Sequence, residues 1–189
     1  MNIAIFGDSL VAGWSPDAPK LIKKNQTWPY LLKSSIPNSQ VFVDGQPGRM
    51  LSNPLQPKAD LNHFKDFIEK STFQNCTLLI LMIGANDLPI KSAPEIIHTI
   101  NEYLKTFQGN KIFVLHPGIQ YQKLPEMFSQ FKNVQKVEAE FKQLKNEINA
   151  KIVELDSCII GADGLHIGAE GQKEIAKRVK EVMQEMKII

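Results

Sequence analysis

A serine near the start of the chain and an aspartate–histidine pair near its end carry groups that acyl transfer needs. Ser9 stands in Gly7-Asp8-Ser9-Leu10, directly after a short apolar run, and Asp163-Gly164-Leu165-His166 places a carboxylate three residues before an imidazole. A serine hydroxyl is a weak nucleophile, so it needs a base within hydrogen-bond reach and an acid that orients this base. A fold that brings the two segments together would therefore complete a Ser-His-Asp arrangement.

Two further loops offer donors for the negative charge that develops on the substrate during acyl transfer. Gly45-Gln46-Pro47-Gly48-Arg49 contains Gly48, whose backbone N–H can approach a substrate closely because glycine has no side chain. Gly84-Ala85-Asn86-Asp87 contains Asn86, a side-chain amide donor, and the N–H of Ser9 at a helix start is a third donor. Each motif alone is also typical of an ordinary turn or helix cap, and only their combination indicates catalysis.

Short apolar runs alternate with helical patterns along the chain, which predicts a doubly wound α/β fold. The expected strands are Ile3–Phe6, Gln40–Val43, Thr77–Ile83, Lys111–Leu115 and Lys151–Leu155. The expected helices are Trp28–Ser34, Ala59–Ser71, Ala93–Phe107, Val134–Ala150 and Ala169–Met186. Ser92-Ala93-Pro94-Glu95 has the spacing of a capping box at the start of the third helix. Because parallel strands end at one edge of a sheet, the loops that carry Ser9, Gly48 and Asn86 are expected to meet there.

Length and composition indicate a single domain over residues 1–189. The chain is 43% apolar and 22% charged with a net charge of +2, which gives no reason to expect a nucleic-acid partner. Cys76 and Cys158 form no CxxC pair and the four histidines lack metal-ligand spacing, so free thiols and no metal are expected. No signal-peptide pattern and no membrane-spanning apolar run is present, which predicts a cytoplasmic protein without stable membrane insertion.

The chain resembles the SGNH hydrolase superfamily, also called GDSL esterases/lipases, whose name refers to a Ser, Gly, Asn and His in four motifs. Here they are Ser9, Gly48, Asn86 and His166, in motifs that together extend over nearly the whole chain. The resemblance implies that Ser9 is the nucleophile, His166 the base and Asp163 its partner. It also implies an oxyanion hole of the Ser9 N–H, the Gly48 N–H and the Asn86 side chain. The implied fold is a flavodoxin-like three-layer α/β/α sandwich with a five-stranded parallel sheet, without a cofactor.

Two segments are similar to arylesterase-type members of the superfamily, which act on short acyl esters and sometimes transfer acyl groups to alcohols. These are Gly13-Trp14 and Gly45-Gln46-Pro47-Gly48-Arg49. Trp14 is equally consistent with core packing, and Arg49 is better explained by a structural ion pair than by a substrate carboxylate. The resulting hypothesis is a serine esterase that hydrolyses short-chain acyl or aryl esters of small molecules.

Several alternatives stay open at this stage. A lysophospholipase or acyl-thioesterase would need an apolar groove, which Met50-Leu51, Leu55 and Tyr121–Phe131 are able to build, and a carbohydrate O-acetylesterase is a third possibility. A non-enzymatic flavodoxin-like binding domain is disfavoured because Asp8 would repel a phosphate and no glycine-rich phosphate motif is present. His116, at the end of the fourth expected strand, is expected at the rim of the site.

Overall fold

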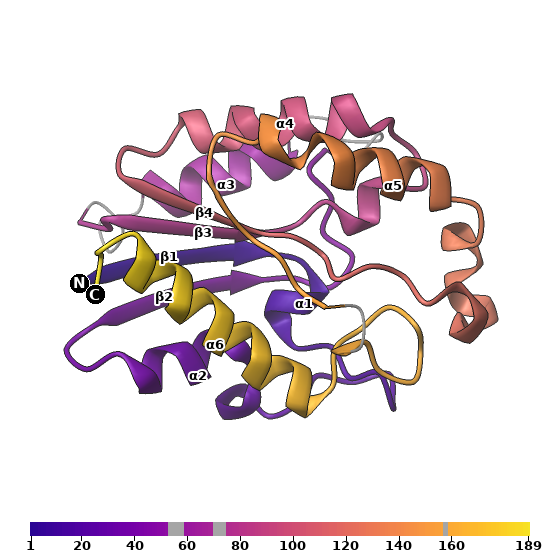
Figure 1. Cartoon of the computed structure of the whole chain (residues 1–189), viewed down its shortest axis with the longest axis horizontal. Helices are drawn as coiled ribbons and strands as arrows, with labels where there is room; N and C mark the ends of the chain where they lie inside the picture. The colour runs from indigo at the N-terminus through magenta and orange to yellow at the C-terminus, as the bar shows by residue number, and fades with distance from the viewer. Residues whose placement is uncertain (53–58, 70–74, 157–158) are drawn as a thin grey trace.

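In the described part of the chain, five parallel strands form one sheet in the order β2-β1-β3-β4-β5 (Figure 1). The structure is a computed structural model that describes residues 1–52, 59–69, 75–156 and 159–189. The strands are β1 Asn2–Gly7, β2 Gln40–Gly45, β3 Leu78–Met82, β4 Asn110–Val114 and β5 Lys151–Val153. All five expected strands are confirmed, and their order is that of flavodoxin-like sheets. Gly7 pairs with Gly45 on β2 and with Met82 on β3, so these three strands end level with one another.

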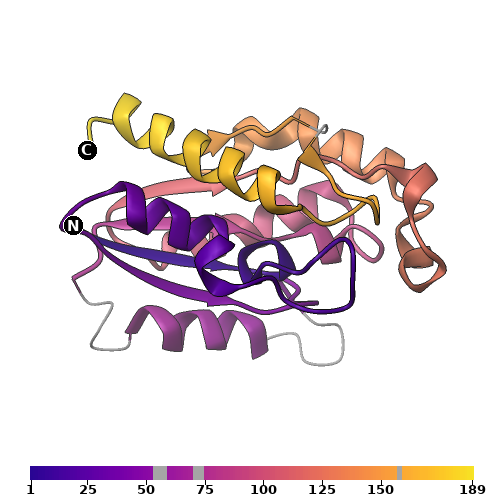
Figure 2. The same cartoon turned by 90° about the horizontal axis from the view of Figure 1, so that it is seen from below.

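Helices cover both faces of the sheet, which confirms the three-layer fold (Figures 1 and 2). One face carries α2 (Trp28–Ser35) and α6 (Ala169–Glu185). The other carries α3 (Ala59–Glu69), α4 (Ala93–Lys105) and α5 (Gln135–Gln143). The predicted end of α3 at Ser71 lies outside the described residues. Short 3₁₀ helices occur at Lys24–Gln26, Ala85–Asp87, Tyr121–Lys123, Glu126–Phe131 and Leu144–Glu147.

The sheet separates two apolar cores, one on each of its faces. Ile3 and Ile5 of β1 pack into the core under α2 and α6, whereas Ala4 and Phe6 pack into the core under α3, α4 and α5. Successive residues of a strand point to opposite faces, so an apolar run on a doubly covered strand fills both cores. This accounts for the strand predictions from unbroken apolar runs.

The start of α4 agrees with the sequence pattern. The side chain of Ser92 caps the helix, and Glu95 accepts the Ser92 backbone N–H at 2.9 Å, so the predicted capping box is confirmed. Both chain ends lie near the amino ends of the strands, away from the short α1 (Ser9–Ala12) that follows β1 (Figure 1). The loops with the candidate catalytic residues therefore lie at the opposite edge from the termini.

The helix expected over residues 134–150 is wrong at its end, because α5 stops at Gln143 and a 3₁₀ turn follows. Asn101 of α4 determines this change. Its Nδ2 donates to the Glu147 carbonyl at 2.9 Å and its Oδ1 accepts the Asn149 N–H at 2.8 Å. These bonds hold the chain in a turn toward β5, which helix propensity alone does not reveal.

Candidate active site

The structure brings Ser9, His166 and Asp163 together from opposite ends of the sequence. His166 Nε2 lies 3.1 Å from Ser9 Oγ, and His166 Nδ1 lies 2.7 Å from Asp163 Oδ2. Ser9 and His166 are only 8% and 4% exposed, so bulk water competes little for these hydrogen bonds. This is the order of contacts that activates a serine hydroxyl in Ser-His-Asp chemistry.

Asp163 is held against His166 by a turn in which its own side chain accepts backbone hydrogen bonds. Asp163 Oδ1 accepts the backbone N–H of Leu165 at 3.0 Å and of His166 at 2.8 Å, while Gly164 adopts φ +73°. Partial burial favours a higher pKa for Asp163, but hydrogen bonds from the His166 ring and from the two backbone N–H groups outweigh it and hold this pKa below its usual value. Asp163 is not the cap of α6, since the residue before that helix is Gly168.

Ser9 is the first residue of α1 and is positioned by its two predecessors. A side chain on Gly7 would place Cβ 2.1 Å from the Met82 carbonyl oxygen, so only glycine fits at the end of β1. Asp8 is the helix cap, because its Oδ1 accepts the Leu10 N–H at 2.9 Å. The carboxylate and the glycine together set the direction of Ser9 at the carboxyl edge of the sheet.

Gly48 and Asn86 lie next to each other in the candidate oxyanion hole. Gly48 has φ +75°, and a Cβ there would meet no atom within 4 Å. Its positive φ therefore favours glycine, and the open space beside it leaves its backbone N–H accessible, as the sequence predicted. Asn86 Nδ2 donates to the Arg49 carbonyl at 3.0 Å, and a primary amide retains a second N–H for a ligand.

Arg49 braces the loop that carries Gly48. Its Nη1 donates to the carbonyls of Gly7 and Asp44, both at 2.8 Å, and its Nη2 lies 2.7 Å from Asp44 Oδ1. The guanidinium also stacks 4.1 Å from the centre of the Phe6 ring. Arg49 is thus the structural ion pair that the sequence favoured, and it joins the Gly48 loop to the Ser9 turn.

The GDSL-like lipase/acylhydrolase family matches residues 3–179 of the chain. The chain belongs to this family. A carbohydrate acetylesterase family member from Sinorhizobium meliloti has a similar fold, with a TM-score of 0.78 at 19% identity over 98% of both chains. The M. smegmatis aryl esterase has a TM-score of 0.76 at 17% identity, over 97% of this chain and 98% of its own. The comparison with curated proteins gives no match.

Family membership makes this GDSL-like hydrolase a carboxylic ester hydrolase, as the four sequence motifs predicted. Within the described ranges, no group of His, Cys, Asp and Glu side chains is placed to hold a metal ion. None of the helices in the same ranges is long and apolar enough to cross a bilayer. Cys76 is a free, buried thiol, while Cys158 lies outside the described residues.

Two buried carboxyl groups behind the Ser9 turn were not identified from the sequence of this GDSL-like hydrolase. Asp8 Oδ2 has no hydrogen-bond partner among the described residues, and burial raises the Asp8 pKa from 3.8 to about 7, with the charge of Asp87 adding to the rise. Asp87 is fully buried; its Oδ2 accepts the Leu51 N–H at 2.9 Å, and Lys91 lies 3.4 Å from Oδ1. Burial also raises the pKa of Asp87. The only signal in the sequence was that each aspartate adjoins a motif residue.

The Asp8 carboxyl should make the GDSL-like hydrolase less stable as the pH rises. Its folded pKa is above the unfolded value, so its stabilising contribution is complete below about pH 4 and is lost as the pH rises through about 7. Asp8→Asn keeps an oxygen for the Leu10 N–H and does not titrate. The measured quantity is the free energy of unfolding of Asp8→Asn minus that of wild type, from urea titrations. We expect this difference to increase by about 2–3 kcal/mol between about pH 5 and about pH 8. Asp66→Asn, on an exposed position of α3, is the control, and a difference that does not change with pH would contradict this role.

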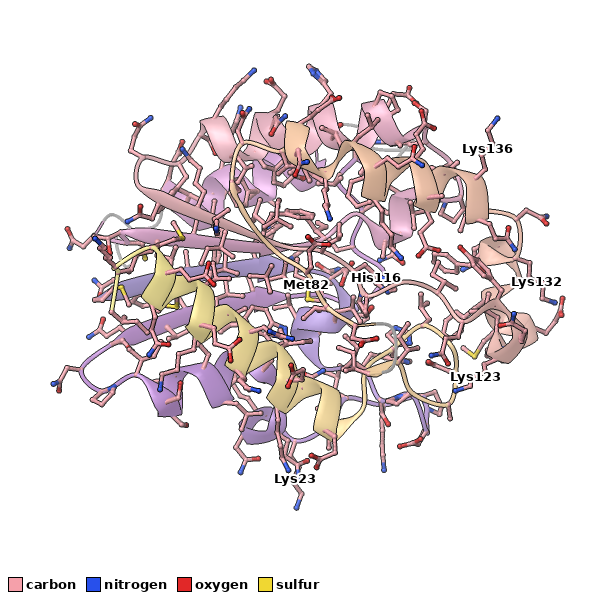
Figure 3. The ribbon with its side chains drawn as sticks, in the orientation of Figure 1. Lys23, Met82, His116, Lys123, Lys132 and Lys136 are labelled. Atoms are coloured by element: carbon pink, nitrogen blue, oxygen red, sulfur yellow. The ribbon has the colours of Figure 1, made fainter. Side chains whose placement is uncertain are left out.

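His116 follows β4 and is half-buried, with the tip of its ring enclosed by the protein. Its Nδ1 accepts the Gly118 N–H at 2.9 Å, and its Nε2 is enclosed without a hydrogen-bond partner among the described residues. In Figure 3 the labels of His116 and Met82 both lie near the carboxyl ends of the strands. Burial lowers the His116 pKa to about 4, so the ring is neutral at neutral pH and adds no charge to the site.

Aromatic side chains flank the His166 ring. The ring centre of Trp14 lies 6.1 Å from that of His166, and the ring centre of Phe128 lies 5.4 Å from it. Trp14 is half-buried beside His166 and is not a core residue. Of the residues expected to form an apolar groove, Leu51 and Leu124 are buried in the core, and Leu55 lies outside the described residues.

Proposed function

We propose that the protein hydrolyses carboxylic esters through an acyl-enzyme on Ser9. The observation that carries this proposal is the pair of contacts of His166, whose Nε2 faces Ser9 Oγ at 3.1 Å and whose Nδ1 is held by Asp163 at 2.7 Å. His166 takes the hydroxyl proton as Oγ bonds to the acyl carbon, and then gives this proton to the leaving alcohol. Water, deprotonated by the same imidazole, releases the acid and restores Ser9.

The oxyanion of each tetrahedral intermediate is assigned to three donors. These are the backbone N–H groups of Ser9 and Gly48 and the side-chain amide of Asn86. Neither backbone N–H has a hydrogen-bond partner in the part of the chain that the structure describes, so both are available to a substrate oxygen. The bond from Asn86 to the Arg49 carbonyl fixes the amide before substrate arrives, which avoids a reorganisation cost during the reaction.

Removal of the Asn86 amide should reduce turnover strongly and should affect substrate binding little. In Asn86→Ala we expect kcat to fall by about 10²–10³ with little change in KM, because the donor acts mainly on the developing oxyanion. Steady-state kinetics with p-nitrophenyl acetate measures both constants. Asn62→Ala, on an exposed position of α3, is the matched control. A raised KM with unchanged kcat would give Asn86 a binding role instead.

We propose esters with a short acyl group or an aryl alcohol as substrates. Structural neighbours are named as an aryl esterase and as a carbohydrate acetylesterase, which supports short esters of either kind. A lysophospholipid or a long-chain thioester is less well supported. Leu51 and Leu124, which would have lined a long apolar groove, are engaged in the core instead.

The test is a rate series with p-nitrophenyl acetate, butyrate and octanoate, together with an acetylated sugar and an acyl thioester. We expect the acetate and butyrate to react with the highest kcat/KM. A clear preference for octanoate or for the thioester would overturn the short-chain assignment. The absence of hydrolysis with every substrate would overturn the esterase proposal itself.

We also propose that residues 1–189 form one domain whose partner is a small-molecule ester. The support for one domain is that both apolar cores lie against the same sheet. A cytoplasmic location is consistent with the free thiol of Cys76, since thiols persist in reducing compartments.

A further inference from the structure

A pocket of about 280 Å³ opens beside the His166–Asp163 pair. One wall is the loop of residues 14–19, and the other is residues 125–128, with Asp163 at the edge nearest the site. Trp14 and Phe128, which flank the His166 ring, are the innermost aromatic residues of these two walls. The pocket and the His166 ring therefore share these two aromatic neighbours.

The pocket lies on the side of the site from which a leaving alcohol departs. Its lining includes Asp163 but no residue of the Gly48 or Asn86 loops, so it is on the His166 side of Ser9 and not on the oxyanion side. A general acid must reach the oxygen of the leaving group. Because His166 Nε2 is the atom beside Ser9 Oγ, the oxygen of the leaving group must lie near Nε2, on the same side of Ser9 as this pocket.

The chemistry of the lining favours an apolar group. Most of the lining residues are aromatic, proline, alanine or methionine, and of the two carboxylates one, Asp163, is already bound by His166. The lining residues include no lysine or arginine, and Lys132 and Lys136 point away from the body of the protein (Figure 3). A sugar would leave its hydroxyl groups without enough partners there, which is costly for polar groups removed from water.

Hydrogen bonds of the two walls indicate that the pocket is formed before substrate binds. In the first wall, Trp14 pairs with Leu21 in an antiparallel bridge and the Ser15 N–H donates to the Lys20 carbonyl at 2.9 Å. In the second, the Phe128 N–H donates to the Pro125 carbonyl at 2.9 Å. A preformed apolar cavity of about 150 Å³ is sufficient for a benzene ring, so this pocket has room for one ring or a short branched alkyl group.

We propose that this pocket binds the alcohol portion of the ester, and that this alcohol is apolar and about the size of one ring. The inference rests on the proposed function, since it assigns one half of the substrate of the same site. It makes Trp14 and Phe128 determinants of alcohol specificity. The acyl group is then held elsewhere, near the oxyanion donors.

The first test varies the alcohol while the acetyl group is constant. Wild type is expected to have a kcat/KM for benzyl acetate that is about 10–200 times that for methyl acetate, two esters of unactivated alcohols. In Phe128→Ala this ratio should fall about tenfold or more. The ratio of the two rates cancels any general effect of the lost ring contact with His166, because that effect acts on both substrates.

A second variant fills the pocket instead of enlarging it. Ala18 lines the pocket on the loop of residues 14–19, and Ala18→Phe should also abolish the preference for benzyl acetate while methyl acetate continues to react. Ile189→Ala removes an exposed apolar side chain at the opposite end of the molecule and should leave the ratio unchanged. Circular dichroism and thermal unfolding verify that each variant is folded.

The outcomes separate this inference from the esterase proposal. If Phe128→Ala and Ala18→Phe leave the ratio of benzyl to methyl acetate unchanged, or change only the ratio of p-nitrophenyl acetate to butyrate, the alcohol assignment is overturned while the esterase stands. A wild-type preference for an acetylated sugar over benzyl acetate would overturn it as well. If wild type hydrolyses none of these esters, the esterase proposal itself is overturned.

Discussion

Ser9→Ala is expected to remove ester hydrolysis almost completely, with a fall in kcat on the order of 10⁶. This is the scale seen in a serine protease when the nucleophile is deleted. Ser9 is 8% exposed and its Oγ contacts only His166 among the side-chain hydrogen bonds of the described residues, so we expect the loss of one oxygen to leave the packing around α1 intact. The measurement is the initial rate with p-nitrophenyl acetate at enzyme concentrations high enough to detect the residual turnover.

The unfolding transition of Ser9→Ala should coincide with that of wild type, which excludes loss of the fold as the cause. An aryl phosphonate ester should become covalently attached to Ser9 in wild type, with a mass increase in the peptide that contains it, and should not label the variant. Retained hydrolysis together with labelling at another residue would remove Ser9 from the mechanism.

Asp163→Asn should lower kcat by about 10⁴ while the turn around it remains folded. The asparagine oxygen continues to accept the N–H groups of Leu165 and His166, which Asp163 Oδ1 accepts in wild type. Its amide then faces His166 Nδ1 as a donor, so the ring proton moves to Nε2. An imidazole with this proton is unable to accept one from Ser9.

A second variant separates this tautomer effect from loss of the turn. In wild type, the hydrogen bonds that lower the Asp163 pKa keep its carboxylate ionised at neutral pH, so Asp163 accepts the Nδ1 proton of His166 there. Asp163→Ala loses the two backbone bonds as well and should unfold more easily than Asp163→Asn. Equal activity of wild type and Asp163→Asn would contradict a base oriented by Asp163.

The regular elements of the fold could be predicted because each has a local pattern. The strands contain short apolar runs, and the start of α4 at Ser92 has a capping box, which is a signal within four residues. The end of α5 had no such signal. It is set by Asn101, which lies 46 and 48 positions away in sequence from Glu147 and Asn149, the residues of the turn that it holds. Contacts of this kind appear only when the helices have packed.

The same difference applies to the candidate site, where some residues could be predicted from the sequence and others could not. Its motif residues were readable because acyl transfer demands a few residue types near strand ends. The residues that support these motif residues could not be identified from the sequence. Asp8 lies against β3, where its N–H donates to the Met82 carbonyl, and near the charge of Asp87. Phe128 reaches His166 from an irregular segment without periodicity. Residues that support a site through tertiary packing carry no spacing that identifies them.

The separation of Ser9 and His166 by 157 positions has a consequence for folding kinetics. Parallel strands and contacts between distant residues form late, because a large loop must close before they stabilise the chain. Hydrolytic activity should therefore return during refolding only when the segment of β5 and α6 has docked on the rest of the sheet. Recovery of turnover would report this final step, whereas compaction and helix content would report earlier ones.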